Sequence, residues 1–376
     1  MKKIAIIGAN MFQNKLIVHA KELGYETHVF AWECGDPGEK SADFFYPISI
    51  KEKELILEKC REIKPVAVCS IGSDLAVLTV NYVSRKLGLN GNSELSDRLA
   101  TNKYEMREAF KRAGVYTPNH IKVTDSKCCA SDINMKFPLI VKPTDRSGSR
   151  AITCVYDENE LESAVQRAID QSFEKAAIIE EFIEGKEYSC ECISYHGHHQ
   201  ILALTEKFTT GSPNYIEVGH IQPAPISDKK IREEIEQTVF KALDALDIKN
   251  SASHTEFRLS DDETIGIIEI GARMGGDCIG SDLVPLSTGL DYMRMVIDVA
   301  EGNQPMMEME GKNVFASIKF LMSRDEHMGI DCKENVLIEE YHEPRDTDNE
   351  VLDSSSRYGY YISICSSYRE ARELFG

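Results

Sequence analysis

Two glutamates on neighbouring segments of the sequence are spaced to hold a divalent cation. In TEFRLSDDETIGIIEI, a hairpin loop at residues 261–264 would place Glu256 opposite Glu269, because both lie equally far from its centre. Directly opposed residues have β-carbons about 5 Å apart, where like charges are destabilising. Mg²⁺ takes one or two carboxylates together with phosphates and water. The spacing therefore predicts a magnesium site, and the alternative is a solvated strand face with an ordinary Glu–Arg pair.

An arginine extends the same strand face. Side chains alternate along a strand, so Gly271 and Arg273 are expected on the side of Glu269. A guanidinium there can hold a carboxylate or an acyl phosphate through two parallel hydrogen bonds.

Lys142 ends the apolar strand FPLIVKP and precedes TDRSGSRAI, a loop of small residues. Such loops let backbone amides approach an anion closely, which favours phosphate binding. The alternative is a lysine at a strand exit followed by a flexible turn, and the segment is not the GxxxxGK[ST] loop. Lys103, in ATNKYEMREAF, indicates by itself only a helix with an exposed lysine.

The segment IIEEFIEGKEYS is expected to be a strand followed by a bend at Gly185. Adenine recognition needs an extended backbone with a donor and an acceptor, and ribose recognition needs a carboxylate further on. Residues 180–183 and Glu187 have this arrangement, although a strand edge with solvated glutamates is the alternative. The HGHH cluster at residues 196–199 is expected at a hairpin turn, as solvated tip residues and not as a metal site.

The composition bounds the class of protein. A chain of 376 residues with 42% hydrophobic and 28% charged residues predicts two or three globular units, without an apolar run long enough for a membrane helix. The start, MKKIAIIGANMF, reads as a first strand and not as a signal peptide. Eleven cysteines without CxxC spacing fit a reducing cytoplasm. A net charge of -19 opposes binding to nucleic acid or to an anionic membrane.

The order of predicted elements indicates a mixed α/β and α+β fold. Alternating strands and helices over residues 1–95 predict a parallel sheet. Hairpins within residues 96–312 predict an antiparallel sheet, with a small lid at about 115–180. Residues 313–376 are expected to be a small C-terminal subdomain. The segment LSDRLATNKYEMREAFKRAG has helical periodicity and a stop at Gly114.

Taken together, Lys103, FPLIVKP with its serine and glycine loop, EEFIEGKE and TEFRL…EIGAR occur in the order and spacing of the ATP-grasp superfamily. The resemblance covers nearly the whole chain. It implies an ATP-grasp fold with a Rossmann-like N-terminal domain, and ATP bound with Mg²⁺ or Mn²⁺ between two α+β subdomains. Gly271 departs from the pattern, because many members have asparagine there. The resemblance implies phosphate contacts from Lys103, Lys142, Ser147, Gly148 and Ser149, adenine contacts from Glu180, Glu181, Phe182 and Ile183, a ribose contact from Glu187, and metal contacts from Glu256 and Glu269.

The segments EIGARMGGDCIG, LSTGLDYMRMVIDVAEG and TEKFTTGSPNYIEVGHIQPAP look most like the L-amino acid ligase branch. That resemblance implies activation of a carboxylate as an acyl phosphate and its ligation to an amine, with ADP released and two amino acids joined. Arg273, Lys142 and His220 would then be catalytic, and Asp74 would contribute from the N-terminal unit. For His220 the alternative is a structural, hydrogen-bonded histidine.

Three other functions are compatible with parts of the sequence. A bicarbonate-activating enzyme related to carbamoyl phosphate synthase or carboxyaminoimidazole synthetase would share the fold. A nicotinamide dehydrogenase is suggested by KKIAIIGAN, which lacks GxGxxG. A noncatalytic nucleotide-binding protein is the third. The sequence leaves open the identity of both substrates and whether the chain forms a homodimer.

Overall fold

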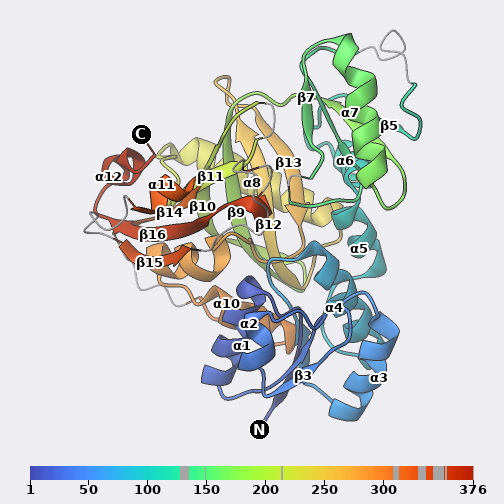
Figure 1. Cartoon of the computed structure of the whole chain (residues 1–376), viewed down its shortest axis with the longest axis vertical. Coiled ribbons are helices and arrows are strands. Elements are labelled where there is room, and N and C mark those ends of the chain that lie inside the picture. The colour runs from blue at the N-terminus through green and yellow to red at the C-terminus, as the bar shows by residue number, and fades with distance from the viewer. Residues whose placement is uncertain are drawn as a thin grey trace.

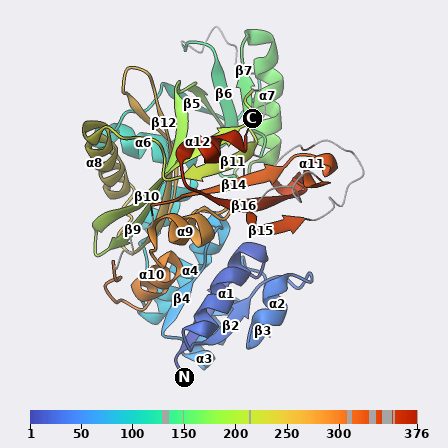
Figure 2. The ribbon, with the colours of Figure 1, turned by 90° about the vertical axis from the view of Figure 1, so that its left-hand side faces the viewer.

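The structure is a computed structural model in which three sheets lie one after another along the long axis of the molecule (Figure 1). The N-terminal sheet and the small sheet with its helix lie at opposite ends, with the large sheet between them (Figures 1 and 2). The boundaries expected near residues 95 and 312 stay predictions. The structure describes residues 1–127, 135–148, 150–212, 215–307, 313–328, 336–341, 351 and 354–375.

The N-terminal sheet is parallel, as predicted, in the order β3-β2-β1-β4. The strand β1 is apolar because both of its faces are buried: Ile4 and Ile6 on one face and Ala5 and Ile7 on the other are fully buried. The strands are β1 (Lys3–Ile7), β2 (Glu26–Phe30), β3 (Phe44–Tyr46) and β4 (Ala67–Cys69). The helices are α1 (Met11–Glu22), α2 (Pro37–Ser41), α3 (Lys53–Ile63) and α4 (Asp74–Leu87).

The segment predicted as one helix is two, α5 (Glu94–Thr101) and α6 (Lys103–Ala113). Asn102 breaks it with φ -114° and ψ 113°, and its side chain accepts hydrogen bonds from the amides of Tyr104 and Glu105, both at 3.1 Å. Asparagine is a favoured helix N-cap, which is why the chain restarts here. The break makes Lys103 the first residue of α6 and turns its side chain inward, where the residue is 7% exposed. The expectation of an exposed lysine was wrong.

The small sheet has the order β5-β8-β6-β7, and α7 (Glu158–Gln171) packs against it. Its strands are β5 (His120–Val123), β6 (Leu139–Pro143), β7 (Thr153–Val155) and β8 (Ala177–Glu181).

The large sheet is antiparallel, as predicted, and also contains the C-terminal strands, since β14 pairs with β11. Its order is β13-β12-β9-β10-β11-β14-β16-β15. The strands are β9 (Lys186–Tyr195), β10 (His198–Thr209), β11 (Glu217–Gln222), β12 (Ser251–Leu259), β13 (Ile265–Gly271), β14 (Phe315–Leu321), β15 (Val336–Tyr341) and β16 (Gly359–Cys365).

The two faces of the large sheet are covered by different helices. The helix α8 (Lys229–Ala245) packs on the face that carries Cys190 and Phe257. The opposite face, here named the α10 face, carries Ile193 and Ala252 and packs on α10 (Tyr292–Ala300) and the N-terminal unit. The remaining helices are a π-helix (Ile279–Leu283), α9 (Val284–Thr288), α11 (Arg324–Met328), a 3-10 turn (Ser354–Ser356) and α12 (Tyr368–Glu373). None of the helices described is long and apolar enough to cross a membrane.

A buried ion cluster joins the small sheet to the large one. Arg107 of α6 donates to Glu180 of β8 at 2.8 and 3.2 Å, and to the carbonyl oxygens of Ile267 and Ile268 of β13 at 2.7 and 2.9 Å. Lys142 of β6 lies 2.5 Å from Oε1 of the same carboxylate, the oxygen that Arg107 Nη2 also contacts. Burial alone raises the pKa of Glu180, but the two cations outweigh it and hold that pKa at about 2.

Replacing Glu180 by glutamine should destabilise the protein strongly, because it leaves two buried cations without their counter-ion. The expected loss in free energy of unfolding is about 3–5 kcal/mol at neutral pH. A folded-state pKa below the ordinary value contributes stability above pH 4.5 and loses it as the pH falls toward 2. The difference between wild type and Glu180→Gln in urea unfolding should therefore narrow on acidification. The control is Glu184→Gln, at an exposed position on the same segment, and equal stability of the two variants would contradict the prediction.

Candidate active site

The two glutamates are paired across a hairpin as predicted, but the loop and the register of the hairpin differ from the prediction. Glu256 of β12 is paired with Glu269 of β13. The loop between the strands runs over residues 260–264, one residue longer than expected. A β-bulge between Glu256 and Phe257 shifts the register by one residue and restores the opposition of the two glutamates. Their side chains are 24% and 26% exposed, so each is accessible from one side.

Two lysines compensate the opposed carboxylates. Lys103 lies 2.9 Å from Glu269 and donates to the carbonyl oxygen of Arg146 at 2.8 Å, at the start of the glycine loop. Lys207 of β10 forms a short hydrogen bond to Glu256. Burial raises the pKa of Glu256, but Lys207 and His254 outweigh it and keep that pKa well below its usual range. Glu256 is therefore ionised.

Lys207 is a residue of this site that the sequence analysis missed. Its side chain is 2% exposed and also lies 3.3 Å from Glu217 and 3.5 Å from Glu187. Burial lowers the pKa of Lys207, but the three carboxylates raise it well above its ordinary value. The available signal was its position in TEKFTT, where strand alternation turns Lys207 away from Phe208 and toward the α10 face.

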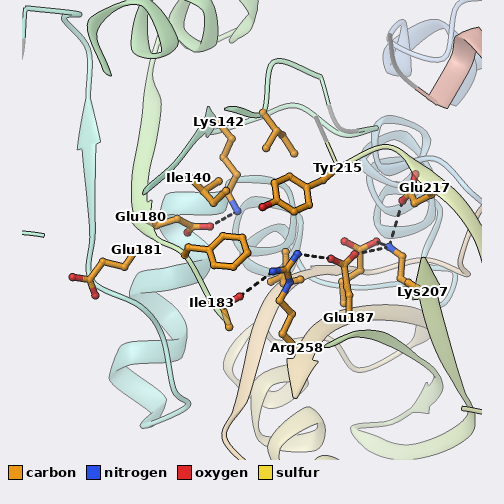
Figure 3. A pocket seen from close by; sticks show the side chains of 14 residues that line it. Ile140, Lys142, Glu180, Glu181, Ile183, Glu187, Lys207, Tyr215, Glu217 and Arg258 are labelled. Atoms are coloured by element: carbon orange, nitrogen blue, oxygen red, sulfur yellow. Dashed lines mark hydrogen bonds and ion pairs between the residues drawn. The ribbon is translucent and has the colours of Figure 1, made fainter. Parts of the chain in front are cut away.

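A cavity opens beside these groups and contains about 640 Å³ of space not filled by protein atoms. Figure 3 shows Lys142 directed at Glu180 on one side, and Arg258, Glu187, Lys207 and Glu217 in a connected row on the other. The lining residues are Ile140, Lys142, Ile152, Glu180, Glu181, Phe182, Ile183, Glu187, Lys207, Tyr215, Glu217, Glu256, Arg258 and Ile268.

The predicted adenine and ribose residues all line this cavity. Arg258 donates to Glu187 at 3.0 Å and to the carbonyl oxygen of Ile183 at 3.1 Å, and its guanidinium lies 4.5 Å from the ring centre of Phe182. Glu180 lies there too, with its charge already engaged by Arg107 and Lys142. Of the loop residues, Ser147 and Gly148 follow Arg146, and Ser149 lies outside the described residues.

Arg273 is held by the N-terminal unit. Its guanidinium donates to Asp74, the first residue of α4, at 2.9 and 3.2 Å. Burial raises the pKa of Asp74, but Arg273 outweighs it and leaves that pKa below its ordinary value. The ion pair also explains why position 271 is occupied by glycine. A β-carbon at position 271 would lie 2.9 Å from Asp74 Oδ1 and 3.2 Å from Arg273 Cζ, so a larger side chain would displace the pair.

His220 lies on the α10 face, opposite Lys207 in the β10–β11 register. It is fully buried, and neither ring nitrogen has a hydrogen-bond partner among the described residues. Burial and the charge of Lys207 lower its pKa to about 3. The alternative of a structural, hydrogen-bonded histidine does not describe this ring.

The sequence analysis also missed a series of buried, hydrogen-bonded side chains behind Glu256. Glu191 is fully buried, accepts a hydrogen bond from the Gly275 amide at 2.9 Å, and forms a short hydrogen bond with His254 Nδ1. The other ring nitrogen of His254 lies 3.3 Å from Glu256. Burial lowers the pKa of His254, but Glu191 raises it to about 9. Glu191 thus connects Glu256 to the loop that follows Arg273.

The prediction that the HGHH residues are solvated tip residues was wrong for one of the three histidines. The side chain of His199 is 4% exposed and bonds to Ser194 at 2.8 Å and Asp244 at 3.2 Å, so it is not a solvated tip residue. His196 and His198 are exposed.

The two hairpin carboxylates fit a magnesium ion. Both offer carboxylate oxygens with an accessible side, which suits a cation that keeps several waters and binds substrate phosphates. Within the described ranges, no group of three or more histidine, cysteine, aspartate or glutamate side chains is placed to hold a metal by itself.

Comparison with known proteins gives a consistent result. Residues 135–282 match the family model described as an ATP-grasp domain. The alanine–anticapsin ligase of Bacillus subtilis (strain 168) is 28% identical over an alignment of 294 positions, and the match covers 69% of this chain and 61% of that protein. The D-alanine–D-alanine ligase of Lacticaseibacillus casei (strain BL23) is 23% identical over an alignment of 247 positions, and the match covers 61% of this chain and 64% of that protein. The chain spans less than two thirds of the length of these curated relatives.

A solved L-amino acid ligase from Bacillus licheniformis has a TM-score of 0.86 at 24% identity, and the match covers 100% of this chain and 96% of that one. The N5-carboxyaminoimidazole synthetase from Staphylococcus aureus, complexed with ADP, has a TM-score of 0.79 at 14% identity, with 100% of this chain and 96% of that one covered. At these identities the likeness shows the fold. The chain therefore has the ATP-grasp fold, and residues 135–282 are the part that matches the ATP-grasp domain model.

Proposed function

We propose that the chain is an ATP-dependent carboxylate–amine ligase that joins two amino acids and releases ADP and phosphate. The observation that carries this proposal is the pairing of two opposed carboxylates with buried lysines beside the cavity. Glu256 and Glu269 face Lys207 and Lys103 there. The likeness to the alanine–anticapsin ligase and to the L-amino acid ligase structure supports amino acids as substrates.

In the proposed complex, ATP lies along the cavity. The backbone from Glu181 to Ile183 would hold adenine against Phe182, and Glu187 would accept from the ribose hydroxyls. The phosphates would then lie near Lys103, Lys142 and Lys207, with the Ser147–Ser149 loop closing over them. Magnesium, held by Glu256 and Glu269, would neutralise phosphate charge when bound.

The reaction proceeds in two steps. A carboxylate oxygen of the first amino acid bonds to the γ-phosphorus while the bond to the bridging oxygen of ADP breaks. Lysine ammonium groups beside the bound phosphates would stabilise the developing charge. The amine nitrogen of the second amino acid then bonds to the acyl carbon. The bond from that carbon to the phosphate oxygen breaks, and the nitrogen loses a proton.

Arg273 is proposed to orient the acyl group. The bidentate ion pair with Asp74 fixes the plane of its guanidinium, and Nη1 donates to the carbonyl oxygen of Met274 at 3.3 Å. The N–H groups of Nη1 and Nη2 that these contacts leave over would meet the substrate. Glu191 holds the following loop through Gly275 and therefore acts as a positioning residue.

The test is a screen for phosphate release over pairs of amino acids, with bicarbonate and other carboxylates as separate arms, followed by mass analysis. Release that depends on two amino acids and yields a dipeptide mass is the expected result. Release that depends on bicarbonate would favour the alternative suggested by the likeness to N5-carboxyaminoimidazole synthetase. Tight ATP binding without release in every arm would indicate a noncatalytic nucleotide-binding protein.

Glu269→Gln should lower ADP formation by about 100- to 1000-fold, because it removes one of the two anionic ligands facing the phosphates. The control is Glu263→Gln in the loop of the same hairpin, at a side chain that is 53% exposed. Steady-state ADP release at saturating ATP and magnesium measures both. Full activity of Glu269→Gln would rule out the proposed metal site.

Gly271→Asn should not improve activity, although many members of the superfamily have asparagine there. The new side chain would overlap the Asp74–Arg273 pair, so we expect turnover to fall by at least about tenfold and stability to drop by about 1–3 kcal/mol. Thermal unfolding and ADP release check the two effects, with Gly271→Ala as the smaller step. Activity above wild type in Gly271→Asn would show that the arginine does not depend on this pair.

A further inference from the structure

An arginine from the C-terminal part of the chain reaches the loop that follows Arg273. Arg357 precedes β16, is 6% exposed, and donates to Asp277 at 2.8 Å. It also donates to the carbonyl oxygen of Ser354 at 2.9 Å, and its guanidinium lies 3.6 Å from the ring centre of Phe320. The planar group is therefore fixed on both its edge and its face.

This arginine is connected to the proposed phosphate site. Glu217 lies 3.3 Å from Lys207, which contacts the proposed metal ligand Glu256. The same carboxylate accepts from the Ser354 hydroxyl at 2.9 Å, and the backbone carbonyl of Glu217 lies 3.5 Å from Arg357 Nη1. One residue thus separates Lys207 from Arg357.

The partner of Arg357 has an unusual backbone. Asp277 and Cys278 have φ values of 49° and 61°, in the left-handed region that residues with a side chain seldom adopt. Such conformations persist only when surrounding structure enforces them, and they occur preferentially at functional sites. Asp277 lies four residues after Arg273 and its side chain is 20% exposed, so this carboxylate is accessible beside the proposed acyl site.

A second observation at the same place indicates a missing ligand. His220 packs edge-on against Phe320, with ring centres 5.6 Å apart, while Arg357 lies over the ring face. Both nitrogens of this buried histidine lack partners among the described residues. An unsatisfied buried polar group costs about 1–3 kcal/mol, so a ligand able to hydrogen-bond there is favoured.

The charges match an amino acid. The ion pair presents one carboxylate and the guanidinium edge formed by Nη1 and Nη2, which now donates to Asp277 at 2.8 Å and lies 3.5 Å from the carbonyl oxygen of Glu217. An α-amino acid carries one amino and one carboxylate group. A guanidinium binds a carboxylate through two parallel hydrogen bonds. The ligand can therefore replace the Asp277–Arg357 contact with two contacts of the same kind.

We propose that Arg357 binds the α-carboxylate of the second amino acid, whose amine attacks, and that Asp277 accepts a hydrogen bond from that amine. The C-terminal segment would then form one wall of the acceptor site. This inference rests on the proposed function. It assigns the acceptor as an α-amino acid with a free carboxylate and not as a simple amine.

The experiment compares three acceptors at a fixed donor amino acid: a free amino acid, its carboxamide, and hydroxylamine, which traps the acyl phosphate as a hydroxamate. Wild type should prefer the free amino acid to its amide. Arg357→Gln should raise KM for the free amino acid by about 10- to 100-fold and abolish this preference, because a charge-assisted hydrogen bond is lost. Hydroxamate formation should persist, since hydroxylamine has no carboxylate.

Two further variants complete the design. Arg369→Gln removes the same charge from α12, where the side chain is 90% exposed, and should behave as wild type. Arg357→Lys keeps the charge without the fork and should retain hydroxamate formation with a weakened preference. An unchanged amino acid to amide preference in either Arg357 variant would overturn the inference, and so would equal loss of hydroxamate and dipeptide in both. Absence of hydroxamate and dipeptide in wild type would instead overturn the proposed function, and this inference with it.

Discussion

The site depends on one buried ammonium group shared by three carboxylates. Lys207 contacts Glu187, Glu217 and Glu256, which come from three other strands of the large sheet. Like charges held this close would repel strongly, since two unit charges 4 Å apart interact by about 4 kcal/mol near a protein surface. The lysine converts that repulsion into attraction. The β9–β12 part of the sheet is thus held together on the α10 face by charge as well as by its backbone hydrogen bonds.

The same arrangement explains how a strongly acidic chain can bind an anionic nucleotide in the proposed function. The lysines that would meet phosphates now neutralise the carboxylates that would meet the metal. Binding of a magnesium–nucleotide complex exchanges partners on both sides, so that each charge remains compensated. The net charge of -19 therefore opposes nonspecific anions, while these paired sites admit one that brings its own cation.

Local patterns predicted the sheets and the central pair of glutamates. The Glu256–Glu269 opposition followed from symmetry about a turn, although a longer loop and a bulge compensate each other to produce it. The break at Asn102 carried a recognisable capping residue, and periodicity across it obscured the signal. The contacts that no spacing reveals join distant segments: Arg107 with Glu180, Asp74 with Arg273, and Asp277 with Arg357. The residues of the first pair lie 73 positions apart in the sequence and those of the second pair lie 199 apart, so only the folded arrangement of the strands brings them together.

The most direct test follows oxygen atoms from the donor carboxylate. If the carboxylate is activated by phosphorylation, one of its oxygens becomes the bridge to phosphorus and leaves with the phosphate when the amine attacks. We predict that a donor amino acid labelled with ¹⁸O in its carboxylate will yield ADP, a dipeptide, and inorganic phosphate that carries one ¹⁸O. Unlabelled phosphate accompanying dipeptide formation, or release of AMP and pyrophosphate, would contradict the proposed chemistry.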